Sequence, residues 1–233
     1  MAELKSTHPV KLFIAGTDTN VGKTFAAALV TKMYRHSGVS VGVYKPTESG
    51  CSRVDGVLTA GDALTLWQAA GQPRTLSDVC PQKFQAPLAP GQAARAEGKS
   101  VDPERLQTGL DCWNSDFDVV IIEGAGGLFS PLADGVLNID LVKQINTDRL
   151  LVVAENRLGA IHQTLATCVA AAHHGVTVDG LILSSTRSST DASVASNAKQ
   201  IAEFINVPVI AEIPYDAIEL SGSSAKLLLD WLK

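Results

Sequence analysis

The sequence predicts one α/β domain over residues 1–233, with a mostly parallel β-sheet flanked by helices on both faces. The main observation is that short runs rich in β-branched residues alternate with helix-like segments along the chain. Several runs are almost continuously apolar, which is typical of strands buried on both faces of a parallel sheet. No repeat or composition break marks a second domain, and 233 residues, 45% of them hydrophobic, can bury a large core.

Six short runs are predicted to form the strands of this sheet. In chain order they are VKLFIAG (10–16), VSVGVYKP (39–46), FDVVIIEG (117–124), RLLVVAE (149–155), VTVDGLILSS (176–185) and VPVIAEIP (207–214). Ligands of open α/β sheets bind beyond the carboxyl ends of the strands, so we expect the functional site at that edge.

Five helix-like segments lie between these strands, and three of them are followed by a glycine that can act as a C-cap. The segments cover 22–37, 59–70, 102–114, 159–174 and 191–205, and the glycines are Gly38, Gly71 and Gly175. The longest connection that lacks the hydrophobic periodicity of a helix or a strand is CPQKFQAPLAPG (80–91). It is either a functional loop or a plain surface excursion.

Charge and cysteine usage exclude several classes of function. A net charge of −5 and a pI near 5.5 give no general attraction to nucleic acid or to an anionic membrane, so neither is an expected partner. The opening segment lacks an apolar leader and no apolar run has the length of a membrane span, which favours a cytoplasmic location. The four cysteines form no C-x-x-C pair and fit buried apolar positions in a reducing compartment; they are Cys51, Cys80, Cys112 and Cys168.

A phosphate-binding loop is indicated by IAGTDTNVGKTFAAALV (14–30), where a strand leads through a glycine turn into a helix. Backbone N–H groups and the positive end of the helix dipole meet at such a helix start and favour an anion. Lys23 would neutralise the β- and γ-phosphates, and Thr24 would bind Mg²⁺. The strict pattern G-x-x-x-x-G-K-[ST] is not met, because Gly16 lies one residue too early and Thr17 stands in its place. The alternative is an ordinary helix start that carries Gly-Lys-Thr; the strand–loop–helix context favours a phosphate-loop NTPase-like fold.

Two acidic residues are candidates for a Mg²⁺ site beside Thr24, because this ion usually takes one or two carboxylates. Glu123 ends an apolar strand beside a glycine turn, so its carboxylate would reach the same edge as the phosphate loop. Asp62, near a helix start, is explained equally well as a partner of the helix dipole.

Seven motifs together give the chain a resemblance to the dethiobiotin synthetase family that covers nearly its whole length. In that family the phosphate loop is likewise one residue longer after its first glycine, which accounts for the failed pattern. The Lys-Pro-x-x-Ser-Gly and Glu-Gly-Ala-Gly-Gly segments are the most specific. The motifs are GTDTNVGKT (16–24), YKPTESG (44–50), GDAL (61–64), FQAPLAP (84–90), EGAGGLFSPL (123–132), RLGAIHQT (157–164) and EIP (212–214).

The resemblance implies an ATP- and Mg²⁺-dependent ring closure in biotin synthesis. One amine of 7,8-diaminononanoate captures CO₂ as a carbamate, and the carbamate oxygen attacks the γ-phosphate of ATP. The second amine then closes a cyclic urea, which gives dethiobiotin, ADP and phosphate. Phosphoryl transfer depends chiefly on positioning and charge neutralisation, so lysines and metal matter more than a side-chain nucleophile. Cys51 is therefore not expected to act as one.

The resemblance also implies roles for individual residues. Lys45, Lys23 and Thr19 match catalytic positions. Lys45 would otherwise be read as a strand-end lysine that reaches solvent. Substrate binding is implied for Thr19, Lys45, Ser49, Gly126 and Gly127, where the glycines let the backbone approach closely. Nucleotide binding is implied for Asn20, Val21, Gly22, Lys23, Thr24, Phe25, Glu123, Gly126, Ser184 and Pro214, and metal binding for Thr24, Asp62 and Glu123.

The segment Leu158-Gly159-Ala160-Ile161-His162 resembles a helix start of the partner subunit that receives the substrate carboxylate. A homodimer would then be part of the active site. Three positions depart from the family pattern: Asn20 replaces a frequent acid, His162 a frequent Asn, and Ser184 or Ser185 an Asn that reads adenine. The departure at Ser184 or Ser185 leaves the base specificity open.

A second class of protein shares the phosphate-loop architecture, namely the ATPase switches that partition plasmids or position division machinery. These proteins usually carry an extra early lysine in a Lys-Gly-Gly-x-Gly-Lys-Thr loop, where this chain reads Ala-Gly-Thr-Asp. An amidotransfer-linked ligase of corrinoid synthesis would need a glutamine-handling domain, for which the chain has no room. The synthetase is therefore the favoured interpretation.

Overall fold

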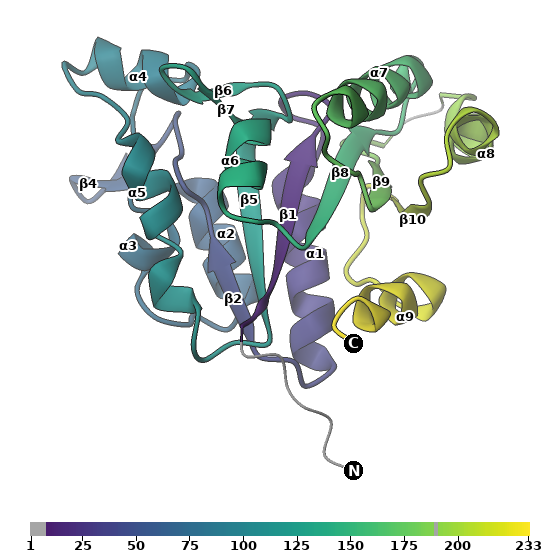
Figure 1. The fold of residues 1–233 in the computed structure, drawn as a ribbon, viewed down its shortest axis with the longest axis horizontal. Coiled ribbons are helices and arrows are strands. Elements are labelled where there is room, and N and C mark those ends of the chain that lie inside the picture. The colour runs from purple at the N-terminus through teal and green to yellow at the C-terminus, as the bar shows by residue number, and fades with distance from the viewer. Residues whose placement is uncertain (1–7, 189–190) are drawn as a thin grey trace.

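A computed structural model describes residues 8–188 and 191–233 of the chain. Its centre is a six-stranded sheet of order β10-β9-β8-β1-β5-β2, in which every neighbouring pair is parallel (Figure 1). The predicted parallel α/β sheet is thus confirmed. Its strands are β1 (Val10–Gly16), β2 (Val41–Tyr44), β5 (Val119–Gly127), β8 (Arg149–Glu155), β9 (Gly180–Ser184) and β10 (Val209–Ile213).

Helices cover both faces of the sheet. The chain leaves β1 toward β2 and leaves β5 toward β8, in opposite directions across the sheet, so right-handed connections place α1 and α6 on opposite faces. Figure 1 shows α6 in front of the sheet and α1 behind it. The helices are α1 (Lys23–His36), α2 (Gly61–Ala69), α3 (Leu76–Val79), α4 (Pro90–Ala96), α5 (Pro103–Thr108), α6 (Asn138–Gln144), α7 (Ala160–His173), α8 (Val194–Phe204) and α9 (Gly222–Asp230).

The core lies along the central strands. Consecutive side chains of β1 and β5, such as Phe13, Ile14, Ile121 and Ile122, are all fully buried. Neighbouring side chains of a strand point to opposite faces, so burial of both neighbours requires cover on both faces. This is why the predicted strands are apolar without alternation.

The predicted helix over 102–114 is interrupted. It divides into α5 and a short 3₁₀ helix, η1 (Asp111–Trp113). The hydroxyl of Tyr44 donates to the carbonyl oxygens of Arg105 and Leu106. A continuing helix would use the Leu106 oxygen for Leu110, but the N–H of Leu110 donates to Gln107 O instead. Gly109 lies against the same phenol, and a Cβ at this position would come within 2.2 Å of its oxygen. A tertiary contact therefore ends a helix that the local pattern would continue.

Two small hairpins and several short helices were not predicted. One hairpin pairs β3 (Ser52–Val54) with β4 (Val57–Thr59), and the other pairs β6 (Pro131–Ala133) with β7 (Val136–Leu137). Both turn on an Asp-Gly pair. In the first, Asp55 and Gly56 both have positive φ, 49° and 79°, as a two-residue hairpin turn requires.

Residues 1–7, in which no apolar leader was expected, lie outside the described part of the chain. Among the residues that the structure describes, no helix combines the length and the apolar character needed to cross a membrane.

Candidate nucleotide and substrate site

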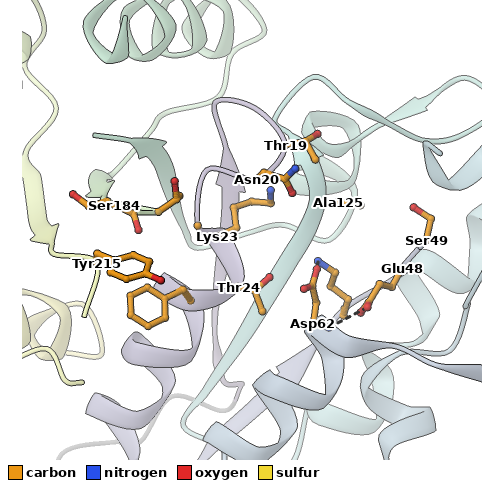
Figure 2. A pocket seen from close by; sticks show the side chains of 16 residues that line it. Thr19, Asn20, Lys23, Thr24, Glu48, Ser49, Asp62, Ala125, Ser184 and Tyr215 are labelled. Carbon is orange, nitrogen blue, oxygen red and sulfur yellow. Dashed lines mark hydrogen bonds and ion pairs between the residues drawn. The ribbon is translucent and has the colours of Figure 1, made fainter. Parts of the chain in front are cut away.

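A cavity of about 500 Å³ opens where the carboxyl ends of the strands meet (Figure 2). This is the edge at which the sequence predicts the site, and the volume suits a small-molecule ligand. Segments that follow β1, β2, β9 and β10 contribute side chains, together with α1, α2 and the end of β5. The lining residues are Thr19, Asn20, Gly22, Lys23, Thr24, Phe25, Lys45, Glu48, Ser49, Asp62, Ala125, Gly126, Ser184, Ser185, Thr186 and Tyr215.

The predicted phosphate loop joins β1 to α1, and Gly22 is the N-cap of this helix. Its φ of 86° lies in the left-handed region, and a Cβ would come within 2.6 Å of the Ser184 hydroxyl oxygen. Only glycine fits both the conformation and the space. The tight turn leaves the first N–H groups of the helix directed at the cavity, where an anion would accept from them.

Lys23 extends back along the phosphate loop. Its ammonium group donates to the carbonyl oxygen of Asp18 at 3.4 Å, and the side chain is 7% exposed. Burial lowers the pKa of Lys23, and the positive charge of Lys45 lowers it further. A triphosphate in the cavity would supply the negative charge that this lysine needs.

Lys45 lies at the centre of a buried network beside the loop. Its ammonium group donates to Glu123 Oε1 at 2.5 Å, to Asp62 Oδ2 at 3.1 Å and to the carbonyl oxygen of Gly124 at 3.3 Å. The side chain is only 2% exposed, so the interpretation as a strand-end lysine that reaches solvent is wrong. The physical reason is that two carboxylates compensate the buried charge.

Charge decides the protonation of this network. Burial alone would lower the pKa of Lys45, but the charges of Glu123 and Asp62 outweigh it and raise the pKa above its usual value. Burial alone would likewise raise the pKa of Asp62, but the charge of Lys45 holds that pKa below its usual range. The lysine is therefore a cation and Asp62 an anion at neutral pH.

The three residues predicted to bind metal lie together. The Thr24 hydroxyl donates to Glu123 Oε1 at 2.9 Å. Asp62 is linked to the same oxygen through Lys45, whose ammonium group donates to both carboxylates. Glu123 Oε2 is buried without a hydrogen-bond partner in the described part of the chain. An unpartnered carboxylate oxygen beside a hydroxyl and a second carboxylate fits the oxygen ligands that Mg²⁺ prefers. Among the described residues, no group of three or more His, Cys, Asp or Glu could hold a metal.

Glu48 is a lining residue that the sequence analysis did not single out. Its Oε1 and Oε2 accept from the backbone N–H groups of Asp62 and Ala63, at 3.0 and 2.9 Å. It thereby joins the segment after β2, which carries Lys45, to the first turn of α2, which carries Asp62. Burial and the nearby charge of Asp62 raise the pKa of Glu48, against the opposing effect of Lys45.

The loop 80–91 supports the segment that carries Lys45. Backbone hydrogen bonds join Lys45 N to Val79 O, Glu48 N to Gln82 O and Phe84 N to Glu48 O. Further along, Gly50 and Cys51 donate to the carbonyl oxygens of Ala86 and Phe84. The loop itself does not line the cavity and contacts the site through this backbone support of the segment after β2.

One end of the cavity carries Ser49 and Glu48, and the other carries Ser184 and Tyr215 (Figure 2). Ser49 donates from its hydroxyl to the carbonyl oxygen of Leu88, at 2.6 Å, which leaves its lone pairs to accept. Gly126 has a φ of 74°, and a Cβ would come within 2.6 Å of the Ser130 hydroxyl oxygen. The backbone of β5 can therefore pass close to the cavity only with glycine here.

The segment 158–162 does not line this cavity in the same chain. Gly159 is the N-cap of α7, with a φ of 96°, and Leu158 is 76% exposed. Leu158 lines a smaller cavity of about 180 Å³, which shares Ser185 and Thr186 with the main one. Leu158 thus faces outward beside the site, whereas Ala160 is buried.

Most of the predicted site residues are brought together, and some are not. Glu123 contacts the cluster from a buried position, whereas Val21, Gly127 and Pro214 are only chain neighbours of lining residues. The lining residues missed from the sequence are Glu48, Ala125, Thr186 and Tyr215, with Ser185 named only as an alternative to Ser184. Two features of the sequence could have indicated them. Glu48 and Ala125 lie within quoted motifs, and Thr186 and Tyr215 lie just after predicted strands.

A phosphate loop that opens into a cavity at the carboxyl edge of a parallel sheet places the chain among the phosphate-loop NTPases. A family model described as an AAA domain matches residues 10–219. The ATP-dependent dethiobiotin synthetase BioD of Rhodopirellula baltica is 44% identical over 211 residues, 86% of this chain and 82% of that protein. The chain belongs to the dethiobiotin synthetase family.

Other relatives and solved structures agree with this placement. The ATP-dependent dethiobiotin synthetase BioD of Bacillus cereus is 35% identical over 90% of this chain and 85% of that protein. A ParA family ATPase from Chlorobium tepidum has a TM-score of 0.56 at 15% identity, over 97% of this chain and 98% of that one. The signal recognition particle receptor FtsY of Elizabethkingia anophelis has a TM-score of 0.56 at 17% identity, over 100% of this chain and 67% of that one. At such identities the two structures show the fold alone.

Proposed function

We propose that this protein closes 7,8-diaminononanoate and CO₂ to dethiobiotin with ATP, as a ligase that forms C–N bonds in biotin synthesis. The observation that carries the proposal is the 44% identity to a dethiobiotin synthetase over most of both chains. The site agrees with it, because the buried side chains of Lys23 and Lys45 lie beside a loop that suits phosphate. This is the charge distribution that phosphoryl transfer to a carbamate requires.

The proposed steps assign most of the work to positioning and charge. One substrate amine adds to CO₂, and a carbamate oxygen then attacks the γ-phosphorus, with ADP as the leaving group. The second amine attacks the carbamate carbon of the mixed anhydride, the urea ring closes, and phosphate leaves. Lys23 holds the β- and γ-phosphates, and Lys45 stabilises the carbamate and the transferred phosphoryl group. Thr19, Ser49, Gly126 and Gly127 hold the diamine and carbamate with hydroxyl and backbone groups.

Mg²⁺ is proposed as the cofactor, held by Thr24, Asp62 and Glu123. It would neutralise charge that develops on the phosphate oxygens. The unpartnered oxygen of Glu123 supports this assignment, since a buried carboxylate oxygen otherwise lacks compensation. Lys45 already contacts both carboxylates, so the lysine and the ion would share the same anionic surface.

The active site is proposed to be completed by a second subunit in a homodimer. Residues 158–162 of the partner subunit would receive the substrate carboxylate at the start of α7. The exposure of Leu158 and Val169, 76% and 63%, supports an apolar contact along this helix. A cytoplasmic location stays part of the proposal. The absence of nucleic-acid partners does so too, on the acidic net charge of −5.

The test is turnover by the purified protein with diaminononanoate, bicarbonate, Mg²⁺ and ATP, with the product identified by mass. We expect dethiobiotin in amounts equal to the ADP formed. The competing class, a partitioning or positioning ATPase, would hydrolyse ATP at a rate independent of the diamine. Hydrolysis without dethiobiotin would therefore contradict the proposal.

A further inference from the structure

The turn that leads into α7 is held by groups from outside that helix. Its N-cap, Gly159, carries no side chain that could accept from the first N–H groups of the helix. The carboxylate of Asp191 instead accepts from the backbone N–H of Leu158 at 2.7 Å. The side-chain amide of Asn197, on α8, donates to the carbonyl oxygen of Arg157 at 3.1 Å. The position of the turn therefore depends on α8 and on the segment just before it.

Asn197 is a buried amide at a position where a helix usually packs an apolar side chain. It is 1% exposed and lies one turn before Ile201, which is fully buried on the same side of α8. Its Nδ2 also donates to Asn156 Oδ1 at 2.8 Å. An amide without partners is costly to bury, so these hydrogen bonds fix one arrangement of α8 and the turn.

The same turn is anchored to the central sheet. The backbone N–H of Asn156 donates to Ser184 O at 2.9 Å, which continues the pairing of β8 with β9 beyond Glu155. On the other side of the turn, α8 packs against α7 (Figure 1). The amide of Asn197 thus joins α8 to the stretch of chain that leads from the sheet into α7. Its removal would release the turn on the α8 side, while the hydrogen bond to the sheet stays in place.

We infer that Asn197 is a positioning residue for the substrate, because it fixes the start of α7 whose N–H groups meet the substrate carboxylate in the partner subunit's site. This inference rests on the proposed function, in which residues 158–162 act across the dimer. Asn197 does not line the described cavity of its own chain, so it acts through the turn and not by contact with a ligand. A hydrogen bond weakens steeply as its angle departs from linear, so a displaced turn weakens carboxylate binding and leaves the reacting amines in place.

The first experiment compares the steady-state kinetics of Asn197→Ala and the parent. The KM for diaminononanoate should rise by about 10-fold, the scale of one lost hydrogen bond to a charged group. Both kcat and the KM for ATP should change little, because the phosphate loop and the lysines are not touched. The matched control is Gln200→Ala, which removes another amide of α8, one that donates to Glu203 of the same helix. This control should behave like the parent.

A second variant keeps the test decisive if Asn197→Ala does not fold, which circular dichroism would reveal. Asn156→Ala removes one acceptor and leaves the hydrogen bond from Asn197 to Arg157. It should raise the KM for diaminononanoate in the same direction, by a smaller factor. The inference is overturned by an unchanged KM for diaminononanoate in the folded variants. It is equally overturned by a parallel rise of the KM for ATP, which would indicate general damage to the site.

The second experiment tests whether Asn197 acts on the partner subunit's site. Asn197→Ala chains are exchanged with a large excess of inactive Lys45→Ala chains, so that nearly every Asn197→Ala chain is in a mixed dimer. The active site of that dimer takes Lys45 from the Asn197→Ala chain and the start of α7 from the other chain, in which Asn197 is intact. Its KM for diaminononanoate should therefore return to the parent value, an effect that a structural role within one subunit would not produce.

A KM that stays raised after verified subunit exchange would show that Asn197 serves its own subunit's site. Failure of the inference can be told from failure of the proposed function, because the parent is assayed for dethiobiotin in parallel. An active parent with unrestored KM in the mixed dimers contradicts the inference alone. A parent that forms no dethiobiotin contradicts the proposed function, and the inference with it.

Discussion

Two buried lysines of one site have opposite electrostatic surroundings. Lys45 donates to two carboxylates, whereas among the described residues Lys23 has only the carbonyl oxygen of Asp18 within hydrogen-bond distance. The pKa of Lys23 is lowered by burial and by Lys45, and that of Lys45 is raised by its carboxylates. Lys23 is thus the residue whose charge a bound triphosphate would compensate.

Replacing Lys23 should therefore remove transition-state stabilisation with little harm to the fold. We expect Lys23→Ala to lower turnover by at least ~10²-fold, the scale for loss of a preorganised charge-stabilising group. The comparison is Lys32→Ala, an exposed lysine of the same helix, which should behave like the parent. Near-normal turnover by a folded Lys23→Ala variant would contradict the assigned role.

The metal assignment predicts a change in Mg²⁺ dependence. Asp62→Asn keeps the shape of the side chain but removes one anionic ligand, so half-maximal turnover should need several-fold more Mg²⁺. The control is Asp111→Asn, an exposed aspartate at the start of η1. If Asp62→Asn titrates with Mg²⁺ like the parent, this carboxylate serves the helix dipole and Lys45 only.

The pH dependence of thiol modification tests the expectation that Cys51 is not a nucleophile. It is 3% exposed, and burial, together with the charge of Glu48, raises the pKa of its thiol to about 11. The reactive thiolate is therefore scarce at pH 8 and grows only as the pH approaches 11. We expect iodoacetamide at pH 8 to leave turnover intact and Cys51→Ala to be active. Rapid inactivation at pH 8, with Cys51 modified in a mass spectrum, would show that this thiol is accessible and ionised.

Among the elements, α2 depends on a side chain from outside the helix. Its N-cap is Ala60, which has no side-chain acceptor, and Glu48 supplies both acceptors instead. One carboxylate thus satisfies two N–H groups of the first turn and fixes the helix that carries Asp62 against the segment that carries Lys45.

Removing these two hydrogen bonds should affect stability and metal binding together. Glu48→Ala leaves two N–H groups without an acceptor, so we expect the free energy of unfolding to fall by ~1–2 kcal/mol, the range for a lost helix cap. Because Asp62 loses its backbone support, the Mg²⁺ requirement should rise as well. Glu104→Ala, at an exposed first-turn position of α5, is the comparison. A loss of stability at unchanged Mg²⁺ dependence would limit Glu48 to a structural role.

Over the whole molecule, the proposed dimer divides the active site between subunits. Lys45 of one subunit would act with residues 158–162 of the other, so each site needs one intact copy of each element. Gly159→Asp tests the second element, because it places a negative charge where the substrate carboxylate would bind. Lys45→Ala and Gly159→Asp chains should each be inactive alone.

Mixing the two inactive chains should restore dethiobiotin synthesis. Random pairing makes about half of the dimers mixed, and each mixed dimer has one intact site, so roughly a quarter of all sites should recover. A mixture of Lys45→Ala with Lys23→Ala should not recover, since both residues belong to the same subunit's half of the site. No recovery after verified subunit exchange would mean that both elements serve one subunit, or that the protein does not act as this dimer.

Local sequence patterns determined the sheet, the phosphate loop and the metal candidates. The apolar composition of runs such as 10–16 and 117–124 is enough to predict that they are buried strands. Gly22, Lys23 and Thr24 are consecutive in the chain, so the phosphate loop can be recognised locally. The Asp-Gly turns of both hairpins were also visible and were missed. Lys45 and Ser49 entered through the family resemblance, because a single strand-end lysine has no local pattern that distinguishes it from one that reaches solvent.

Only the tertiary structure decided which distant residues share the site. Glu48 acts on α2 from fourteen residues away, and Tyr215 joins Phe25 at one cavity because β10 and β1 end at the same edge. The break after Thr108 in the predicted helix 102–114 was likewise set by Tyr44, a residue of β2. Secondary structure follows from periodicity within a segment, whereas a site consists of contacts between segments, and these depend on the order and direction of the strands.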